Sequence, residues 1–194
     1  MRRDRPADYL ASIGVPMRFR RWSTRREWEA MFGPWPHLTG APIVYVHGRT
    51  GTGKTGFGVL WALEHGVAGR DVRWIAASDL TEGLKREFDG GRRQLHASLA
   101  AADALVIDGL FDGRGIVGDR PTAWQVEVLS LLIDDRWRNL RPLLVTSNWS
   151  SQMLGDIAPP LASRLVDPDG GDLLKLDGYD RRIAARKRVM GLAS

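Results

Sequence analysis

The chain has 194 residues with no cysteine, and its 28 Lys and Arg against 23 Asp and Glu give a net charge of +5. This length suits one α/β domain with a buried core. The lack of cysteine excludes a disulfide scaffold, a thiolate zinc site and cysteine catalysis. No apolar run approaches the roughly 20 residues that span a bilayer, and no apolar stretch follows the basic residues 1–6. We therefore expect a cytoplasmic protein with no signal peptide and no membrane partner.

Positive charge is concentrated at the two ends of the chain. Residues 1–38 contain eight Arg against four acids, and residues 181–194 contain five basic residues and no acid. Basic ends on a near-neutral middle favour an anionic partner, usually a nucleic acid, although a high-GC genome would also give a solvated Arg-rich surface. The first segment also holds three tryptophans, which either stack on bases or pin it onto a core, and we favour the core: Trp22, Trp28 and Trp35.

Residues 1–38 contain two short helix candidates, at about 8–13 and about 24–32. Thr24 and Glu27 have the spacing of a capping box at the start of the second helix, and a Gly-Pro-Trp-Pro run ends it. A segment this short does not make a separate domain. We predict a basic N-terminal appendage that leans on the domain that follows.

One motif dominates the middle of the chain. Its eight residues fit the pattern G-x-x-x-x-G-K-[ST] at every position: Gly48, Arg49, Thr50, Gly51, Thr52, Gly53, Lys54 and Thr55. Before it, β-branched and aromatic residues at 43–46 predict a buried strand, and after it the apolar spacing over 56–65 predicts a helix. Strand, glycine loop and helix together indicate a phosphate-binding P-loop (Walker A) rather than a Gly- and Thr-rich turn.

Each part of the motif has an expected role in nucleotide binding. The glycines allow backbone conformations that a side chain forbids, so the loop N–H groups can cradle phosphate oxygens beside the helix N-terminus. Lys54 is expected to reach the β and γ phosphates, and the Thr55 hydroxyl to ligate Mg²⁺. ATP and Mg²⁺ are therefore the predicted cofactors.

A second motif has the pattern of a Walker B strand. Four apolar residues at 104–107 are followed by Asp108. The carboxyl ends of parallel strands meet at one edge of a sheet, so we expect Asp108 beside Thr55, where it would hold the Mg²⁺ water shell. The alternative is an ordinary strand that ends in a turn aspartate.

The remaining chain alternates between strands and helices. Further strands are expected at 72–77, 143–146 and 173–176, and helices from a Ser78 or Asp79 cap to Phe88 and at 92–102, 123–139, 159–165 and 181–190. This order predicts a five-stranded parallel sheet with helices on both faces, a three-layer α/β sandwich. Lys54, Asp108 and Asn148 all follow strands at the carboxyl edge, where such folds bind ligands.

The order of these motifs resembles that of the AAA+ ATPases of the DnaC/IstB type, which are replicative helicase loaders and transposition helper ATPases. After Walker A and Walker B come a long helix, a strand ending Thr-Ser-Asn at 146–148, and a short helix with Ser-Arg-Leu at 163–165. The stretch at 13–19 is similar to the Gly-x-Pro-x-Arg-[Tyr/Phe] segment that often precedes their core.

The resemblance covers about residues 9–183. It implies an AAA+ P-loop ATPase core at 39–180, with the appendage at 1–38 before it and a basic C-terminal helix at 181–194 after it.

The same resemblance implies roles for three residues outside Walker A and B. Asn148 matches sensor 1, which touches the γ-phosphate or positions the attacking water, although it would also suit a helix cap. Arg164 matches the arginine finger that reaches a neighbouring subunit, which implies a head-to-tail homo-oligomer when ATP is bound; the alternative is a surface arginine. Arg182 falls at a sensor 2-like place, or is a basic residue of the tail.

The chain departs from this family directly after Asp108. The loaders usually carry a second acid there, which polarises the attacking water, whereas this chain has Gly109. Asp112 lies three residues on, and the sequence alone does not place it. ATP and Mg²⁺ binding is therefore expected, whereas hydrolysis is expected to be weakened.

These features favour an ATP-binding AAA+ ATPase that resembles DnaC-type helicase loaders. It would act in DNA replication through ATP-dependent assembly on single-stranded DNA or a hexameric helicase. The alternatives are an IstB-like transposase helper and a nucleotide-gated adaptor with little hydrolysis. A small-molecule P-loop kinase is less favoured, because the sequence shows no lid with clustered arginines.

Overall fold

The centre of the protein is a parallel sheet with the strand order β2-β3-β4-β1-β5. The computed structural model describes residues 6–22, 24–89, 94–112, 120–167 and 169–178. The strands are β1 (Ile43–His47), β2 (Val72–Ala76), β3 (Ala104–Asp108), β4 (Leu143–Ser147) and β5 (Gly171–Lys175). The five-stranded parallel sheet is therefore confirmed, and its last strand begins at Gly171 rather than at 173.

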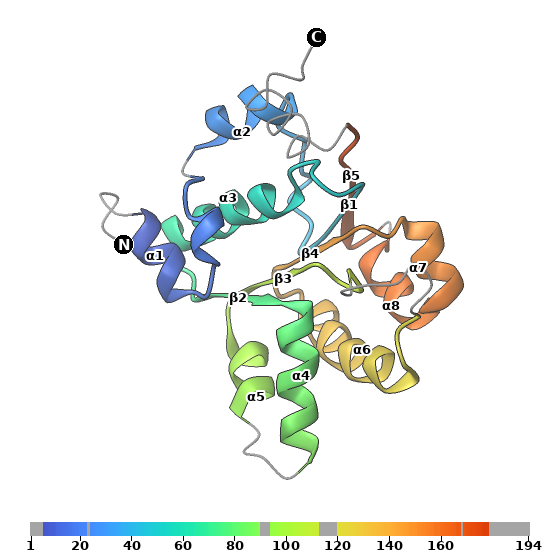
Figure 1. Ribbon diagram of the computed structural model, residues 1–194. Coiled ribbons are helices and arrows are strands. Elements are labelled where there is room, and N and C mark those ends of the chain that lie inside the picture. Colours follow the sequence, from blue (N-terminus) through green and yellow to red (C-terminus); the bar gives the residue numbers. More distant parts are fainter. Residues whose placement is uncertain (1–5, 23, 90–93, 113–119, 168, 179–194) are drawn as a thin grey trace, which may run out of the picture.

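Helices cover both faces of this sheet and make the predicted three-layer sandwich (Figure 1). One layer contains α1 (Pro6–Ser12), α2 (Arg25–Phe32) and α3 (Lys54–Val67). The other contains α4 (Ala77–Phe88), α5 (Gln94–Ala101), α6 (Ala123–Arg138), α7 (Ser151–Ile157) and α8 (Pro159–Leu165).

Side chains alternate between the two layers along each strand, as the pleat requires. On β1, Val44 and Val46 pack in the cluster with α3, whereas Ile43 and Tyr45 pack in the cluster with α4 to α8. All five residues of β1 are buried, because strands pair on both of its sides and helices cover both faces of the sheet. Such a central strand holds the loop that follows it in a fixed place.

Most helix predictions are confirmed, and two need correction. The capping boxes of α2 and α6 both form. The predicted cap of α4 is wrong, because β2 runs directly into the helix and Ser78 and Asp79 lie inside its first turn. The helix α7 was expected only in the alternative that Asn148 caps a helix. The helix expected at 181–190 lies outside the described residues. None of the helices in the described part combines the length and apolar character needed to cross a membrane.

The N-terminal segment packs on α3 and on the edge of the sheet. The N–H of Trp74 in β2 donates to the Ile13 carbonyl at 2.9 Å. The chain approaches so closely here that a Cβ on Gly14 would lie 2.7 Å from the Trp74 carbonyl oxygen. Trp22 and Trp28 are only 6% and 1% exposed. These tryptophans therefore pin the segment onto the core, as predicted.

Candidate nucleotide-binding site

The P-loop runs from the carboxyl end of β1 to the first residue of α3, Lys54. Its glycines lie against neighbouring chain. A Cβ on Gly48 would come within 2.2 Å of the Leu176 carbonyl oxygen, and one on Gly53 within 2.8 Å of the Phe32 ring. Gly53 also has a φ of 99°, in the left-handed region that favours glycine. The motif therefore needs glycine here for space as well as for conformation.

The side chain of Lys54 folds back over the loop and is only 7% exposed. Its ammonium donates hydrogen bonds to the carbonyls of Gly48 and Arg49 at 2.7 and 2.9 Å, and to the Asn148 Oδ1 at 2.8 Å. These contacts join the end of β1 to the end of β4. Lys54 thus places its positive charge at the mouth of the loop, and Asn148 lies beside it as the sequence predicted.

Asp108 lies next to the start of α3, where Walker B was expected. The Thr55 hydroxyl donates to the Asp108 carboxylate, at 3.1 Å from Oδ1. Thr146 of β4 donates to the same Oδ1 at 2.7 Å, and its own hydroxyl accepts from the Gly109 N–H at 2.8 Å. Thr146 therefore orients the carboxylate, a role that its place in a strand motif did not reveal.

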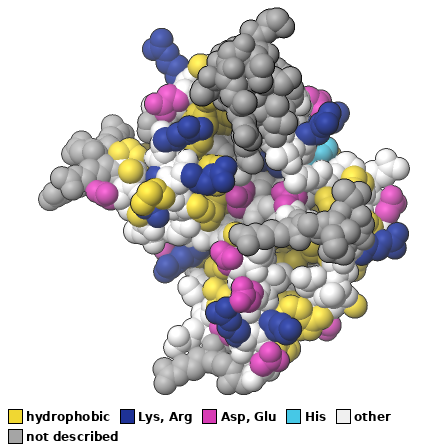
Figure 2. Space-filling view, in the orientation of Figure 1, with side chains coloured by type: hydrophobic (Ala, Val, Ile, Leu, Met, Phe, Trp, Pro, Cys, Tyr) yellow, Lys and Arg dark blue, Asp and Glu magenta, His cyan; other side chains and the backbone are white. Residues whose placement is uncertain are grey.

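These groups line one cavity of about 700 Å³. Its floor is the P-loop and the ends of β3 and β4, and its other wall comes from the N-terminal segment. The lining residues include Arg18, Phe19, Arg21, Trp22, Phe32, Lys54, Thr55, Asp108, Asp112, Thr146 and Asn148. In Figure 2, Lys and Arg side chains lie around the N-terminal helices, and carboxylates lie toward the middle of the same face.

The N-terminal wall of the cavity is aromatic and cationic. Trp28 is fixed to the P-loop by a hydrogen bond of 3.1 Å from its Nε1 to the Gly53 carbonyl. The rings of Trp28 and Phe32 lie 5.2 Å apart, and the Arg21 guanidinium lies 5.0 Å from the Trp22 ring. The sequence favoured a packing role for these tryptophans over stacking on bases. The wall also provides flat faces and positive charge beside the phosphate loop.

Asp112 enters the site from the turn after β3, and its Oδ1 accepts the Asn148 N–H at 2.7 Å. Burial raises the pKa of the Asp112 carboxyl to about 6, with the Asn148 N–H and Lys54 acting in the opposite direction and Asp108 in the same one. Asn148 does not cap the next helix, because Ser150 caps α7 through a bond to the Met153 N–H.

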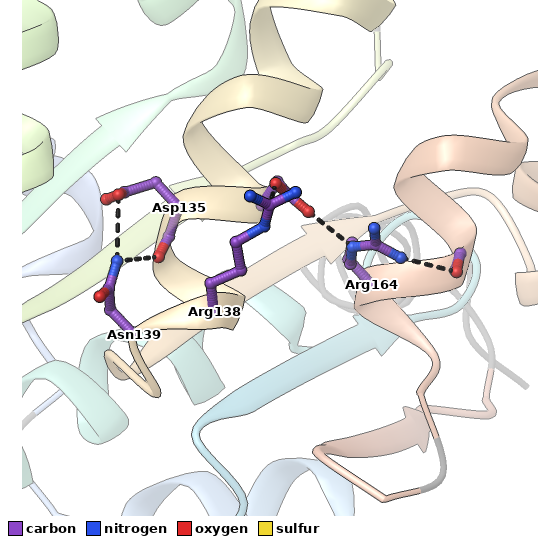
Figure 3. Close-up of polar contacts among 6 residues, drawn as sticks. Asp135, Arg138, Asn139 and Arg164 are labelled. Atoms are coloured by element: carbon purple, nitrogen blue, oxygen red, sulfur yellow. Dashed lines mark hydrogen bonds and ion pairs between the residues drawn. The ribbon is translucent and has the colours of Figure 1, made fainter.

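Arg164 lies apart from this cavity, on the surface shared by α6 and α8 (Figure 3). Its Nε pairs with the Asp134 carboxylate at 2.7 Å, and its guanidinium lies 4.4 Å from the centre of the Trp137 ring. Arg138 pairs with the same carboxylate at 2.7 Å. The side chain is 31% exposed. Its assignment as a finger for a second subunit stays a prediction, and Arg182 lies outside the described residues.

The donor set fits a magnesium nucleotide. Thr55 and Asp108 present a hydroxyl and a carboxylate, and Mg²⁺ prefers such hard oxygen ligands together with phosphate oxygens and water. The loop before them has the P-loop pattern, and Lys54 provides the positive charge. In the described part of the chain, these are the residues that would hold ATP and Mg²⁺.

Comparisons with known proteins extend this description. No protein-family model matches the chain. An uncharacterized Bacillus subtilis (strain 168) protein, YqaM, is 32% identical over 122 residues, which span 61% of this chain and 37% of YqaM. A DnaC helicase loader structure has a TM-score of 0.58 and 22% identity, over 78% of this chain and 87% of that one. The initiator DnaA, bound to AMPPCP and single-stranded DNA, has a TM-score of 0.60 and 16% identity, over 81% and 48%.

These structural matches establish the fold. The chain shares with the DnaC and DnaA structures an α/β fold built on a parallel sheet, as its order of strands and helices predicted. It spans about half the length of the DnaA chain and most of the DnaC chain.

Proposed function

We propose that this protein binds ATP with Mg²⁺ and acts in DNA replication as an AAA+ ATPase of the helicase-loader type. The observation that carries the proposal is the convergence of Lys54, Thr55, Asp108 and Asn148 on one cavity at the carboxyl edge of the sheet. These four residues come from three different strand ends, and each offers the chemistry that a bound triphosphate requires.

Each wall of the cavity has a part in this proposal. The P-loop N–H groups and the Lys54 ammonium would bind the β and γ phosphates, and Thr55 with Asp108 would hold Mg²⁺, which neutralises phosphate charge when bound. Phe32 and Trp22 offer aromatic surface for the base, and Arg21 on the rim attracts the anion. Asn148 would hold the Lys54 ammonium in place.

The proposed partners are single-stranded DNA and a hexameric helicase. A basic N-terminal segment and the likeness to DnaA bound to single-stranded DNA support the first. The fold shared with a DnaC helicase loader over most of both chains supports the second. We further propose that ATP promotes head-to-tail assembly, in which Arg164 of one subunit faces the nucleotide of the next.

The first test is ATP binding by Lys54→Ala, with Lys85→Ala as the matched control. Lys85 is an exposed lysine of α4 that does not line the cavity. We expect Lys54→Ala to lose ATP binding by at least about 100-fold, since a phosphate-paired ammonium is worth a few kcal/mol. Lys85→Ala should bind as the wild type does. Equal affinity in all three proteins would contradict the proposed site.

The second test concerns assembly and turnover. ATP hydrolysis is measured over a range of protein concentrations, with and without single-stranded DNA, alongside sedimentation with ATP and with ADP. The proposal expects turnover per chain to rise with protein concentration and with DNA.

A second candidate function, a nucleotide-gated adaptor, is favoured by Gly109, which stands where a second acid is usual. ATP-dependent assembly with no turnover under any condition would support the adaptor.

A further inference from the structure

The turn after β3 is held to the end of β4 by two hydrogen bonds and is closed by a third within the turn itself. The Leu110 N–H donates to the Thr146 carbonyl at 2.7 Å, and the Ser147 hydroxyl donates to the Leu110 carbonyl at 2.7 Å. The Asp112 N–H closes the turn onto the Gly109 carbonyl at 3.0 Å. Leu110 is fully buried. Asp112 therefore has a fixed position, set by the same strand that supplies Thr146 and Asn148.

Two residues of this turn adopt left-handed backbone conformations. Gly109 has a φ of 78°, and Phe111 has a φ of 56° although it is not glycine. Side chains rarely adopt this region, and such residues cluster at functional sites. Here the two conformations reverse the chain and return Asp112 toward β3. The Phe111 ring packs 5.2 Å from the Trp149 ring, which supports its conformation.

The reversal brings the Asp112 side chain to the space beside Gly109. A Cβ built on Gly109 would lie 3.6 Å from the Asp112 Cβ and 3.6 Å from its Oδ2. A second acid at position 109 would project into this same space. Asp112 also lines the cavity with Lys54, Thr55 and Asp108. Asp112 thus places its carboxylate in the space that a side chain at position 109 would occupy.

We propose that Asp112 is the general base for ATP hydrolysis and replaces the acid that Gly109 does not provide. This inference rests on the proposed function, because it needs ATP in the cavity beside Lys54 and Asp108. One Asp112 oxygen, Oδ1, is held by the Asn148 N–H at 2.7 Å. The other, Oδ2, is the oxygen that would accept a proton from water.

The step balances without any further reagent. The oxygen of a water molecule attacks the γ-phosphorus, and the bond between this phosphorus and the β–γ bridging oxygen breaks. ADP leaves with the bonding pair, and inorganic phosphate forms. The proton that the attacking water loses passes to Asp112 Oδ2, and from there to solvent after the products leave. No electron transfer is involved.

The surroundings of Asp112 suit a base that works near neutral pH. Burial raises its pKa to about 6, and the charged and titratable groups that act on it or feel its charge are Lys54, Asp108 and Tyr45. A base is most effective when its pKa lies near the working pH. An ordinary exposed aspartate, with a pKa near 4, would be a weaker proton acceptor.

The test compares Asp112→Asn with the wild type and with Asp156→Asn, an exposed acid of α7. Asparagine keeps an oxygen for the Asn148 N–H, so we expect a folded protein with native circular dichroism. It should bind a fluorescent ATP analogue within about threefold of the wild type, yet hydrolyse ATP at least about 100-fold more slowly. Asp156→Asn should match the wild type in both measurements.

Two further measurements separate a base from a merely structural residue. The wild-type turnover number should fall about tenfold per pH unit below pH 6, and this limb should be absent from the residual activity of Asp112→Asn. In the nucleotide-free protein, carboxyl carbon NMR should show one aspartate that titrates near pH 6 and is missing from the variant. Adding Gly109→Asp to Asp112→Asn should restore turnover at least tenfold, since aspartate tolerates the left-handed region better than most residues.

The experimental outcomes distinguish a failure of the proposed ATP-binding function from a failure of the Asp112 base assignment. If the wild type does not bind ATP, the proposed function fails and this inference fails with it. If the wild type binds ATP but never hydrolyses it, or if Asp112→Asn hydrolyses ATP within threefold of the wild type, the base assignment is overturned and the nucleotide site stands. Should Asp112→Asn lose native circular dichroism, the wild-type pH profile decides: a fall in turnover below pH 6 supports the base, and a turnover that is flat through pH 6 overturns it.

Discussion

The indole Nε1 of Trp28 donates a hydrogen bond of 3.1 Å to the carbonyl oxygen of Gly53, the residue before the P-loop lysine. This bond joins the N-terminal segment to the P-loop. Trp28 is 1% exposed and lies 5.2 Å from the Phe32 ring, which itself covers Gly53. The segment before the first strand is thus part of the candidate nucleotide site.

This relationship predicts that Trp28→Phe weakens both folding and ATP binding. The change keeps an aromatic ring but removes one of two hydrogen bonds to the Gly53 carbonyl, which also accepts the Phe57 N–H at 2.9 Å. The loss of one such bond costs about 0.5–1.5 kcal/mol of unfolding free energy. The loop should then be less well ordered, and ATP affinity should fall severalfold. Urea denaturation and nucleotide titration measure the two effects.

Trp124→Phe is the matched control, because Trp124 lies on α6 and packs against the exposed Phe88, away from the P-loop. It should leave ATP affinity unchanged. If both variants bind ATP as tightly as the wild type, the N-terminal segment has no part in holding the loop.

Asn148→Ala should slow hydrolysis more than it weakens ATP binding. The Asn148 oxygen accepts one hydrogen bond from the Lys54 ammonium at 2.8 Å, and its loss leaves the ammonium with freedom to move when the γ-phosphate reacts. We expect a 10- to 100-fold loss in turnover number, or about 1.4–2.7 kcal/mol, with ATP affinity within about threefold. Asn139→Ala is the control, since the Asn139 side chain bonds to Asp135 at the end of α6 (Figure 3). Equal losses in the two variants would remove Asn148 from the site.

The sequence predicted those parts of the site that depend on local pattern. Lys54 and Thr55 follow a glycine loop between a strand and a helix, and Asp108 ends an apolar run, so their neighbours along the chain are enough to place them. The sheet edge then brings the two motifs together, and the Thr55 hydroxyl lies 3.1 Å from Asp108. No knowledge of the remaining packing was needed.

The parts that the sequence did not predict depend on contacts between distant segments. The placement of Asp112 requires the left-handed turn at Gly109 and Phe111, and no pattern in the sequence specifies that turn. The start of β5 was missed because Asp172 is polar, whereas in the structure it is buried and accepts bonds from the Thr39 N–H and hydroxyl. The short α7 was missed because it has only seven residues.

Arg136 makes a different prediction, about stability alone. It is completely buried in α6 and donates to the carbonyls of Leu99 and Ala102 at 3.0 and 3.1 Å, and to those of Asp103 and Pro142 at 3.2 and 2.9 Å. Burial lowers its pKa to about 10. One guanidinium therefore fastens the end of α5 and the starts of β3 and β4 together.

Arg136→Met should lower the free energy of unfolding by about 3–5 kcal/mol, because it leaves four carbonyls without this donor. Arg138→Met on the same helix, with a side chain that is 67% exposed, should cost less than about 1 kcal/mol. Urea denaturation of both variants measures this difference. If Arg136→Met unfolds at the wild-type urea concentration, the carbonyls must find water or other donors.

Arg164 and Arg138 provide a matched pair for the finger hypothesis, because both pair with the Asp134 carboxylate at 2.7 Å. Replacing either by alanine removes one ion pair on the same carboxylate. If Arg164 reaches the nucleotide of a neighbouring subunit, Arg164→Ala should bind ATP normally but lose the part of turnover that rises with protein concentration. That loss should be about 10³-fold or more. Arg138→Ala should retain it. Similar turnover in both variants would assign Arg164 to packing on Trp137 instead.

Asp112 should cost stability at neutral pH if burial raises its pKa to about 6 from the ordinary value of 3.8. The folded state then binds this proton more tightly than the unfolded state, so its contribution to stability is complete below pH 4 and is lost as the pH rises through 6. Asp112→Asn is neutral throughout. It should therefore exceed the wild type in unfolding free energy above pH 7, by up to about 3 kcal/mol, and match it near pH 4. Urea denaturation of both proteins between pH 4 and pH 8 measures how the difference in their unfolding free energies changes with pH. A difference that stays constant with pH, or a variant that is less stable at pH 8, would contradict a raised pKa and with it the buried, proton-accepting carboxylate.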